Sequence, residues 1–73
     1  MEIFQERLRL CREGMDKTQE EAAKALGIGF RTYCRYEHGE SDPSLIPRVN
    51  LADYFQVSLD YLTGRTDIRD VNR

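Results

Sequence analysis

Histidine and cysteine are scarce in this chain, and tryptophan is absent. One histidine and two cysteines in 73 residues do not form the spacing of a common zinc site, so neither a metal nor another cofactor is expected. Cys11 and Cys34 fall within predicted helices, where the thiols of an intracellular protein stay reduced. No serine or cysteine stands beside a plausible general base, and no glycine-rich phosphate loop is present. The chain is therefore not expected to be an enzyme.

The chain also lacks a long apolar run and a signal peptide. A membrane-spanning helix needs about 20 mostly apolar residues, and no stretch of this sequence approaches that length. A cytoplasmic protein with no membrane segment is therefore expected. The hydrophobic fraction of 40% and the charged fraction of 33%, mixed in sign, predict one small folded domain.

Positive charge is not in surplus, because the net charge is −2 and the isoelectric point lies near 5.3. Taken alone, this balance argues against a nucleic-acid partner, since phosphate binding usually requires a basic face. The local distribution differs from the total. Residues 29–38 hold Arg31 and Arg35 against Glu37, while Glu40 and Asp42 follow directly. The sign of the local charge decides whether a phosphate can bind, and in this stretch the charge is of mixed sign.

The stretch from Thr18 to Gly39 predicts two short helices with a tight break between them. Thr18 and Glu21 form the T-x-x-E pattern of a capping box at the start of the first helix. Gly27 suits the left-handed residue that ends this helix, and Gly29 is an acceptable N-cap for the next one. The lengths of the two helices and of their link have the proportions of a helix-turn-helix.

Three further helices are predicted around this pair, over residues 1–13, 44–55 and 58–63, because apolar side chains recur there at helical spacing. Pro47 is acceptable only in the first turn of its helix, and Ser58 is the expected N-cap of the last one. The predicted fold class is all-α, a compact five-helix bundle. Residues 1–64 would form the domain, and residues 65–73 a short, frayed C-terminal tail.

Four sequence motifs indicate a fold more specifically than the lengths of the helices do. They are T-Q-E-E-A-A-K-A-L-G-I from Thr18, R-Y-E-H-G from Arg35, P-S-L from Pro43 and V-S-L-D-Y-L from Val57. With them the chain resembles the Cro/CI-type (XRE-like) helix-turn-helix family of transcriptional regulators over residues 4–64. The resemblance implies a lambda-repressor-like domain that binds double-stranded DNA. It further implies a repressor that recognises a near-palindromic operator as a homodimer.

The resemblance also implies which residues would meet the bases. In similar proteins the second helix of the pair lies in the major groove, which here would present Phe30, Arg31, Cys34 and Arg35. An arginine fork binds guanine O6 and N7, a phenylalanine contacts a thymine methyl, and a small cysteine lets the helix approach closely. Without the resemblance, two arginines would equally fit an ordinary solvated helix surface.

Further residues are implied as phosphate contacts: Gln19, Thr32 and Ser41. Gln19 matches a glutamine that commonly contacts a phosphate in the family, at a helix start whose backbone amides favour the same anion. Arg12 and Glu37 match an arginine–glutamate pair that locks the first helix onto the recognition helix. Glu40 and Asp42 stand where similar proteins frequently carry basic residues, which predicts a modest affinity of the monomer for DNA.

Self-association is expected through the C-terminal part of the domain. The proposed dimer set is apolar and comprises Val57, Leu59, Tyr61 and Leu62, extended by Ile68. The competing interpretation is that Leu59 and Leu62 close the hydrophobic core. The main functional alternative is a protein-interaction module, an antirepressor or antitoxin that kept the fold but binds a protein partner. A third possibility is that the chain is the DNA-binding part of a longer protein.

Overall fold

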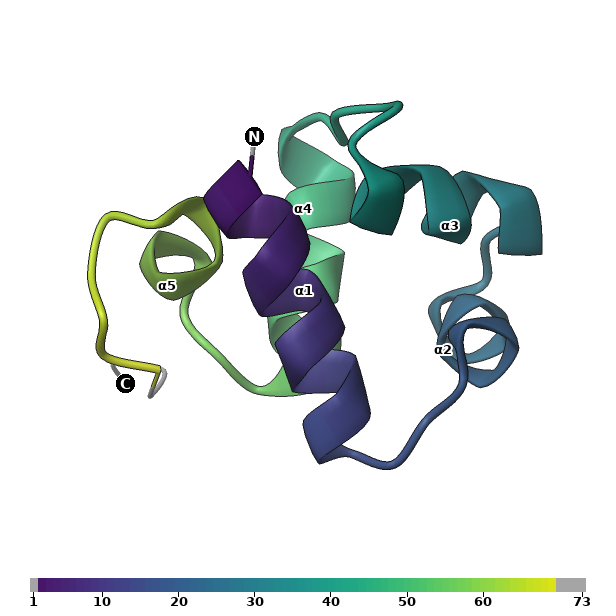
Figure 1. Cartoon of the computed structure of the whole chain (residues 1–73), viewed down its shortest axis with the longest axis horizontal. Helices are drawn as coiled ribbons and strands as arrows, with labels where there is room; N and C mark the ends of the chain where they lie inside the picture. The colour runs from purple at the N-terminus through teal and green to yellow at the C-terminus, as the bar shows by residue number, and fades with distance from the viewer. Residues whose placement is uncertain (1, 70–73) are drawn as a thin grey trace.

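The computed structural model of the protein describes residues 2–69 and consists of five helices joined by short loops (Figure 1). The helices are α1 (Glu2–Gly14), α2 (Gln19–Leu26), α3 (Phe30–His38), α4 (Leu45–Phe55) and α5 (Leu59–Thr63). The described residues contain no strand. The all-α prediction is confirmed, and every predicted helix is present.

The central helix α1 contacts both α3 and α5, while α4 packs against α2 and α5 (Figure 1). Each helix turns one apolar face toward the same interior, which is why helical spacing predicted the core. The buried apolar side chains are Phe4, Leu8, Cys11, Ala22, Ala23, Tyr33, Tyr36, Leu51, Ala52, Phe55, Val57, Tyr61 and Leu62. Cys11 is thus a small residue of the core.

The capping devices predicted for the helix pair are present. Thr18 Oγ1 accepts a hydrogen bond from the Glu21 N–H at 3.0 Å, and Glu21 Oε1 accepts one from the Thr18 N–H at 2.9 Å. A cap of this kind stabilises a helix by about 1 kcal/mol. Gly27 ends α2 with a φ of +72°, a left-handed conformation that costs glycine little. Gly29 is the N-cap of α3.

The end of α3 requires glycine for two reasons. Gly39 has a φ of +78°, and a Cβ at this position would collide with the side-chain amide of Gln5 on α1. Any other residue would therefore be strained in its backbone and would also displace Gln5. Gly39 thus lets α1 and the end of α3 lie close together.

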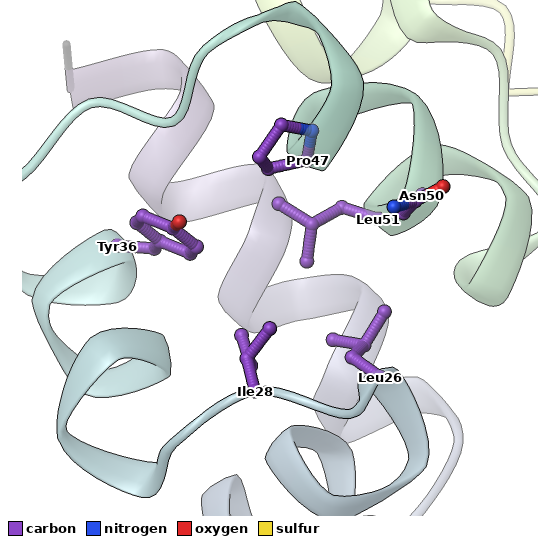
Figure 2. A pocket seen from close by; sticks show the side chains of 6 residues that line it. All are labelled: Leu26, Ile28, Tyr36, Pro47, Asn50 and Leu51. Atoms are coloured by element: carbon purple, nitrogen blue, oxygen red, sulfur yellow. The ribbon is translucent and has the colours of Figure 1, made fainter.

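A small apolar pocket of about 70 Å³ lies between the turn of the helix pair and α4 (Figure 2). Its lining residues are Leu26, Ile28, Tyr36, Pro47, Asn50 and Leu51. The side chains of Leu26 and Ile28 point from the turn toward Leu51 on α4 (Figure 2). These apolar contacts hold the turn, and with it the start of α3, against the rest of the domain.

Helix α4 has a buried apolar face and an exposed side. Pro47 lies in the first turn, as expected, and three apolar residues of the helix are buried: Leu51, Ala52 and Phe55. Val49, another apolar residue of α4, has 36% of its surface exposed. Arg48 donates from Nε to the Pro43 carbonyl at 2.7 Å, and its guanidinium lies 4.9 Å from the centre of the Phe4 ring. Its side chain therefore covers the edge of the core.

The prediction of a frayed tail is wrong for residues 65–69, which we call the C-terminal strap. Arg7 on α1 donates from Nη1 to the carbonyls of Tyr61 and Thr66, each at 2.6 Å, and from Nη2 to Asp67 at 2.7 Å. The Arg69 carbonyl accepts a hydrogen bond from the Ser58 N–H at 2.9 Å. The strap therefore belongs to the folded domain. The remaining predicted tail residues, 70–73, lie outside the described residues.

Within residues 2–69, no helix has the length and apolar character needed to cross a membrane. The same part of the chain holds no cluster of three or more histidine, cysteine, aspartate or glutamate side chains that could bind a metal ion.

Candidate nucleic-acid interface

Helix α3 has one face in the core and one face open to solvent. Tyr33, Tyr36 and Glu37 point inward and are buried. Arg31 and Arg35, one turn apart, are exposed on the other side, and Phe30 is 52% exposed at the start of the helix. Helix α3 lies at the edge of the molecule (Figure 1), and its exposed side carries accessible side chains, two of them cationic.

The other residues predicted to contact DNA differ in their accessibility. Thr32 is exposed, whereas Cys34, Ser41 and Gln19 are half-buried. Cys34 turns toward α2, where its thiol donates a hydrogen bond to Gln19 Oε1 across 3.4 Å. Of the four residues predicted for base contact, three are thus open to a partner and Cys34 is already engaged.

Gln19 is tied to the protein at both ends of its amide. Its Oε1 accepts from Cys34, and its Nε2 donates to Glu37 Oε1 at 3.1 Å. These contacts were not predicted from the sequence. The signal was available in the spacing, because a buried face centred on residues 33, 36 and 37 places residue 34 at its margin, toward α2. Gln19 therefore braces α2 against α3 in the free protein.

Arg12 and Glu37 form the ion pair that the sequence led us to expect. Arg12 Nε lies 2.7 Å from Glu37 Oε2, and Nη2 lies 3.2 Å from Oε1, a two-point contact between α1 and α3. Arg12 Nη1 also donates to the Lys17 carbonyl at 2.9 Å, which fixes the loop before α2. The pair and its neighbours hold the first three helices in one arrangement.

Burial and hydrogen bonding act in opposite directions on Glu37. Burial alone would raise the pKa of Glu37, but the hydrogen bonds to its carboxylate, that from Arg12 foremost, lower this pKa below its ordinary value. Burial beside this carboxylate raises the pKa of Tyr33 well above its usual range. The Tyr33 hydroxyl has no partner in hydrogen-bonding geometry among the described residues.

The starts of the two helices present different electrostatic environments to an anion. The first turn of α3 has no acidic residue, and its N-cap, Gly29, provides no side-chain acceptor. The backbone amides and the positive dipole end of α3 therefore favour an anion there. The first turn of α2 carries Glu20 and Glu21, which oppose a phosphate near Gln19. The loop after α3 adds Glu40, an exposed acid 3.9 Å from His38.

The expected dimer surface needs a correction. Val57, Tyr61 and Leu62 belong to the hydrophobic core of the monomer, and Leu62 has no exposed surface at all. Their apolar character is used within the fold, because α5 is too short to bury its core face and also present a second apolar face. Leu59 is half-buried and packs against the core. Ile68 on the strap is 67% exposed.

Comparison with known proteins agrees with this geometry. A family profile described as helix-turn-helix matches residues 8–62. The cryptic phage CTXphi transcriptional repressor RstR of Vibrio cholerae is 39% identical over 85% of this chain and 55% of its own length. The HTH-type transcriptional regulator ImmR of Bacillus subtilis is 35% identical over 90% of this chain and 52% of its own length.

A further relative, the uncharacterized HTH-type transcriptional regulator YqaE of Bacillus subtilis, is 38% identical over 82% of this chain and 52% of its own length. The chain thus spans little more than half the length of these three relatives. No solved structure matches the chain with significance.

Proposed function

The chain belongs to the Cro/CI-type (XRE-like) helix-turn-helix family of transcriptional regulators, and from this membership we propose that it binds double-stranded DNA by placing α3 in the major groove. Arg31 and Arg35 would contact guanine edges through O6 and N7, and Phe30 would pack against a thymine methyl. Cys34 would lie at the groove with a side chain small enough for close approach. The family is one of regulators and not of enzymes, in agreement with the sequence prediction.

One observation carries this proposal: Phe30, Arg31 and Arg35 of α3 are exposed, while Tyr33 and Tyr36 of the same helix are buried. A surface helix with only a structural role would not need an exposed phenylalanine at its first turn beside two arginines on one edge. The open N-terminus of α3 adds a place for a phosphate at the same end of the helix.

Phosphate contacts would fix the orientation of α3 on the duplex. Thr32 and Ser41 are proposed for this role, together with Gln19. Gln19 uses one of the two N–H donors of its amide for Glu37, so the second N–H of Nε2 is the donor left for a phosphate. The acidic Glu40 in the loop after α3 supports a modest affinity for a single site.

We further propose that the protein acts as a homodimer on a near-palindromic operator and represses by blocking polymerase. Two half-sites about one helical turn apart, roughly 34–36 Å, would double the contacts that one α3 can make. With three of the expected interface residues in the core, Leu59 and Ile68 are the members of that set that remain available for self-association.

The experiment that tests the proposal is selection of bound duplexes from a random DNA pool, followed by affinity measurements over a range of salt concentrations. The wild type is expected to enrich a two-fold symmetric motif. The Arg31→Ala, Arg35→Ala variant should lose it, since each good arginine–guanine contact contributes about 1–3 kcal/mol of discrimination.

The matched control is Arg9→Ala, which removes an exposed arginine from α1 and should leave the motif unchanged. If the wild type enriches no sequence even at low salt, the DNA-binding proposal is wrong. Enrichment of a single, asymmetric half-site would instead retain α3 as the reading element and contradict the homodimer.

A further inference from the structure

The side chain of Gln19, at the start of α2, is held by two residues of α3 that differ in their chemistry. Gln19 Nε2 donates to Glu37 Oε1 at 3.1 Å, and Gln19 Oε1 accepts from the Cys34 thiol across 3.4 Å. Gln19 and Cys34 are half-buried, whereas Glu37 is buried. The amide therefore lies between a buried anion and a thiol, at the boundary between the two helices.

The carboxylate of Glu37 determines which end of the amide faces it. An ionised carboxylate can only accept hydrogen bonds, and Arg12 keeps Glu37 ionised through contacts to its two oxygens at 2.7 and 3.2 Å. If the oxygen of the Gln19 amide faced Glu37, two acceptors would meet and neither would gain a hydrogen bond. The nitrogen of the amide is therefore the end that fits beside Glu37.

Cys34 completes this orientation from the other side of the amide. With Nε2 beside Glu37, Oε1 of Gln19 faces Cys34, and the thiol donates a hydrogen bond to it. A residue without a donor at position 34 would leave Oε1 without this partner, and the amide would be held at one end only. Cys34 thus contributes an S–H donor as well as its small size.

One N–H of Gln19 Nε2 remains, at a helix start that has other free donors. The Glu21 N–H binds Thr18 Oγ1 and the Ala22 N–H binds the Thr18 carbonyl, each at 3.0 Å. The backbone N–H groups of Gln19 and Glu20 come before these bonds and have no acceptor within residues 2–69. Because the same turn also carries two acids, a phosphate can bind here only to donors that are held in place.

We propose that Glu37 and Cys34 are positioning residues, which fix the Gln19 amide so that its remaining N–H is directed at a phosphate of the bound DNA. This inference rests on the proposed binding of DNA through α3, and it adds the residues that set one phosphate contact. Cys34 then acts through Gln19 and not by touching a base. The two roles can be separated, because a phosphate contact carries no direct information on the base sequence.

A double-mutant cycle between Cys34 and Gln19 tests the proposal. The four proteins are the wild type, Cys34→Ala, Gln19→Ala and the double variant, and the probe is the duplex that the wild type selects from the random pool. Cys34→Ala alone is expected to weaken binding roughly threefold, as the loss of one hydrogen bond does. In the Gln19→Ala background it should have no effect, because the residue through which it acts is gone.

Two further variants serve as rescue and as matched control. Cys34→Ser restores a donor at this position and should bind within about twofold of the wild type. Thr32→Ala removes another proposed phosphate contact from α3, and Thr32 makes no hydrogen bond to Gln19 within the described part of the chain. Its effect should therefore add to that of Gln19→Ala. Circular dichroism verifies that each variant is folded.

NMR of the ¹⁵N-labelled wild type examines the amide before any DNA is added. One of the two side-chain N–H signals of Gln19 should lie downfield of its ordinary position, because this proton is donated to the Glu37 carboxylate. The selected duplex should then displace mainly the other signal, which belongs to the proton directed at the phosphate. In Cys34→Ala this second displacement should be smaller.

Three results would overturn the inference. Additive effects of Cys34→Ala and Gln19→Ala would show that Cys34 acts independently of Gln19. A changed base preference of Cys34→Ala in the selection would make Cys34 a base contact. Ordinary positions of both Gln19 signals in the free protein would show that Glu37 does not hold the amide. A wild type that selects no duplex is a different result, because it refutes the proposed function and the phosphate contact together.

Discussion

The carboxylate of Glu37 on α3 and the guanidinium of Arg12 on α1 meet in a two-point contact of 2.7 and 3.2 Å, where their side chains are 2% and 13% exposed. The contact joins the first helix of the domain to the helix proposed to read DNA. Because both groups are largely removed from water, each depends on the other for its solvation.

Removing one member of this pair should cost more than removing both. Glu37→Gln leaves the Arg12 charge without its partner, and a loss of about 3 kcal/mol in unfolding free energy is expected. The Arg12→Met, Glu37→Gln double variant should lose less than Glu37→Gln alone, and therefore less than the sum of the two single variants. Urea denaturation of the wild type, Arg12→Met, Glu37→Gln and the double variant measures the coupling. Strict additivity would show that the pair contributes nothing as a pair.

The stability of the protein should fall as the pH falls, because the Glu37 carboxylate becomes protonated in acid. Its pKa in the folded protein is lowered from the ordinary value of 4.5. A group of this kind stabilises the fold above its unfolded pKa, and the contribution disappears as the pH falls through the lower, folded pKa. Thermal unfolding between pH 7 and pH 3 is the measurement. Glu37→Gln should show a flatter profile, and an unchanged slope would contradict the assignment.

The two cysteines should differ in reactivity. Burial raises the pKa of Cys11, although Arg69 and Arg7 partly oppose this effect, and the side chain lies in the core. Cys34 is half-buried at the edge of α3. A thiol-specific dye at pH 8 should therefore label one site rapidly and the second only after unfolding. Cys34→Ser should abolish the rapid phase. If Cys11→Ser abolishes the rapid phase instead, Cys11 is not buried in the core as described.

Arg7 should stabilise the strap as well as the helices. Arg7→Ala removes the donors to the Tyr61 and Thr66 carbonyls, and hydrogen bonds that involve a charged group contribute about 1.5–3 kcal/mol. A loss of that size is expected, with faster amide exchange at Ser58, whose N–H binds the Arg69 carbonyl. Arg65→Ala removes an exposed arginine of the strap and should change neither value.

The helices and their ends could be predicted because they depend on local chemistry. Thr18 with Glu21 specifies a capping box, and Gly27 and Gly39 supply left-handed ends, whatever the rest of the chain does. Tyr33 and Tyr36 lie three residues apart and are buried on one face of α3, in keeping with helical spacing. In such segments the periodicity and the capping residues agree, so the interpretation needs no knowledge of distant contacts.

The contacts that could not be predicted join residues far apart in the chain. Arg7 and Thr66 are 59 positions apart. The alternating charges of residues 65–69 form no local pattern that predicts the contacts of the strap. The apolar residues of α5 were ambiguous for another reason. The spacing of Leu59 and Leu62 shows that they share a helix face, but only the packing shows that Leu62 faces the core.

The position of Gln19 leads to a last prediction, on the coupling between α2 and α3. Its Nε2 donates to Glu37 Oε1 across 3.1 Å, so Gln19→Glu would place a second carboxylate at that distance from a buried one. Two like charges this close disfavour ionisation of both, which raises the pKa of one carboxyl group. The variant should be less stable than wild type at pH 7 and should regain stability as the pH falls toward 5, the opposite of the wild-type trend.

Gln19→Ala, which only removes the hydrogen bond to Glu37, should keep the wild-type trend. Thermal unfolding of the three proteins against pH decides the matter: if Gln19→Glu follows the wild-type profile, the Gln19 side chain does not occupy this position in solution.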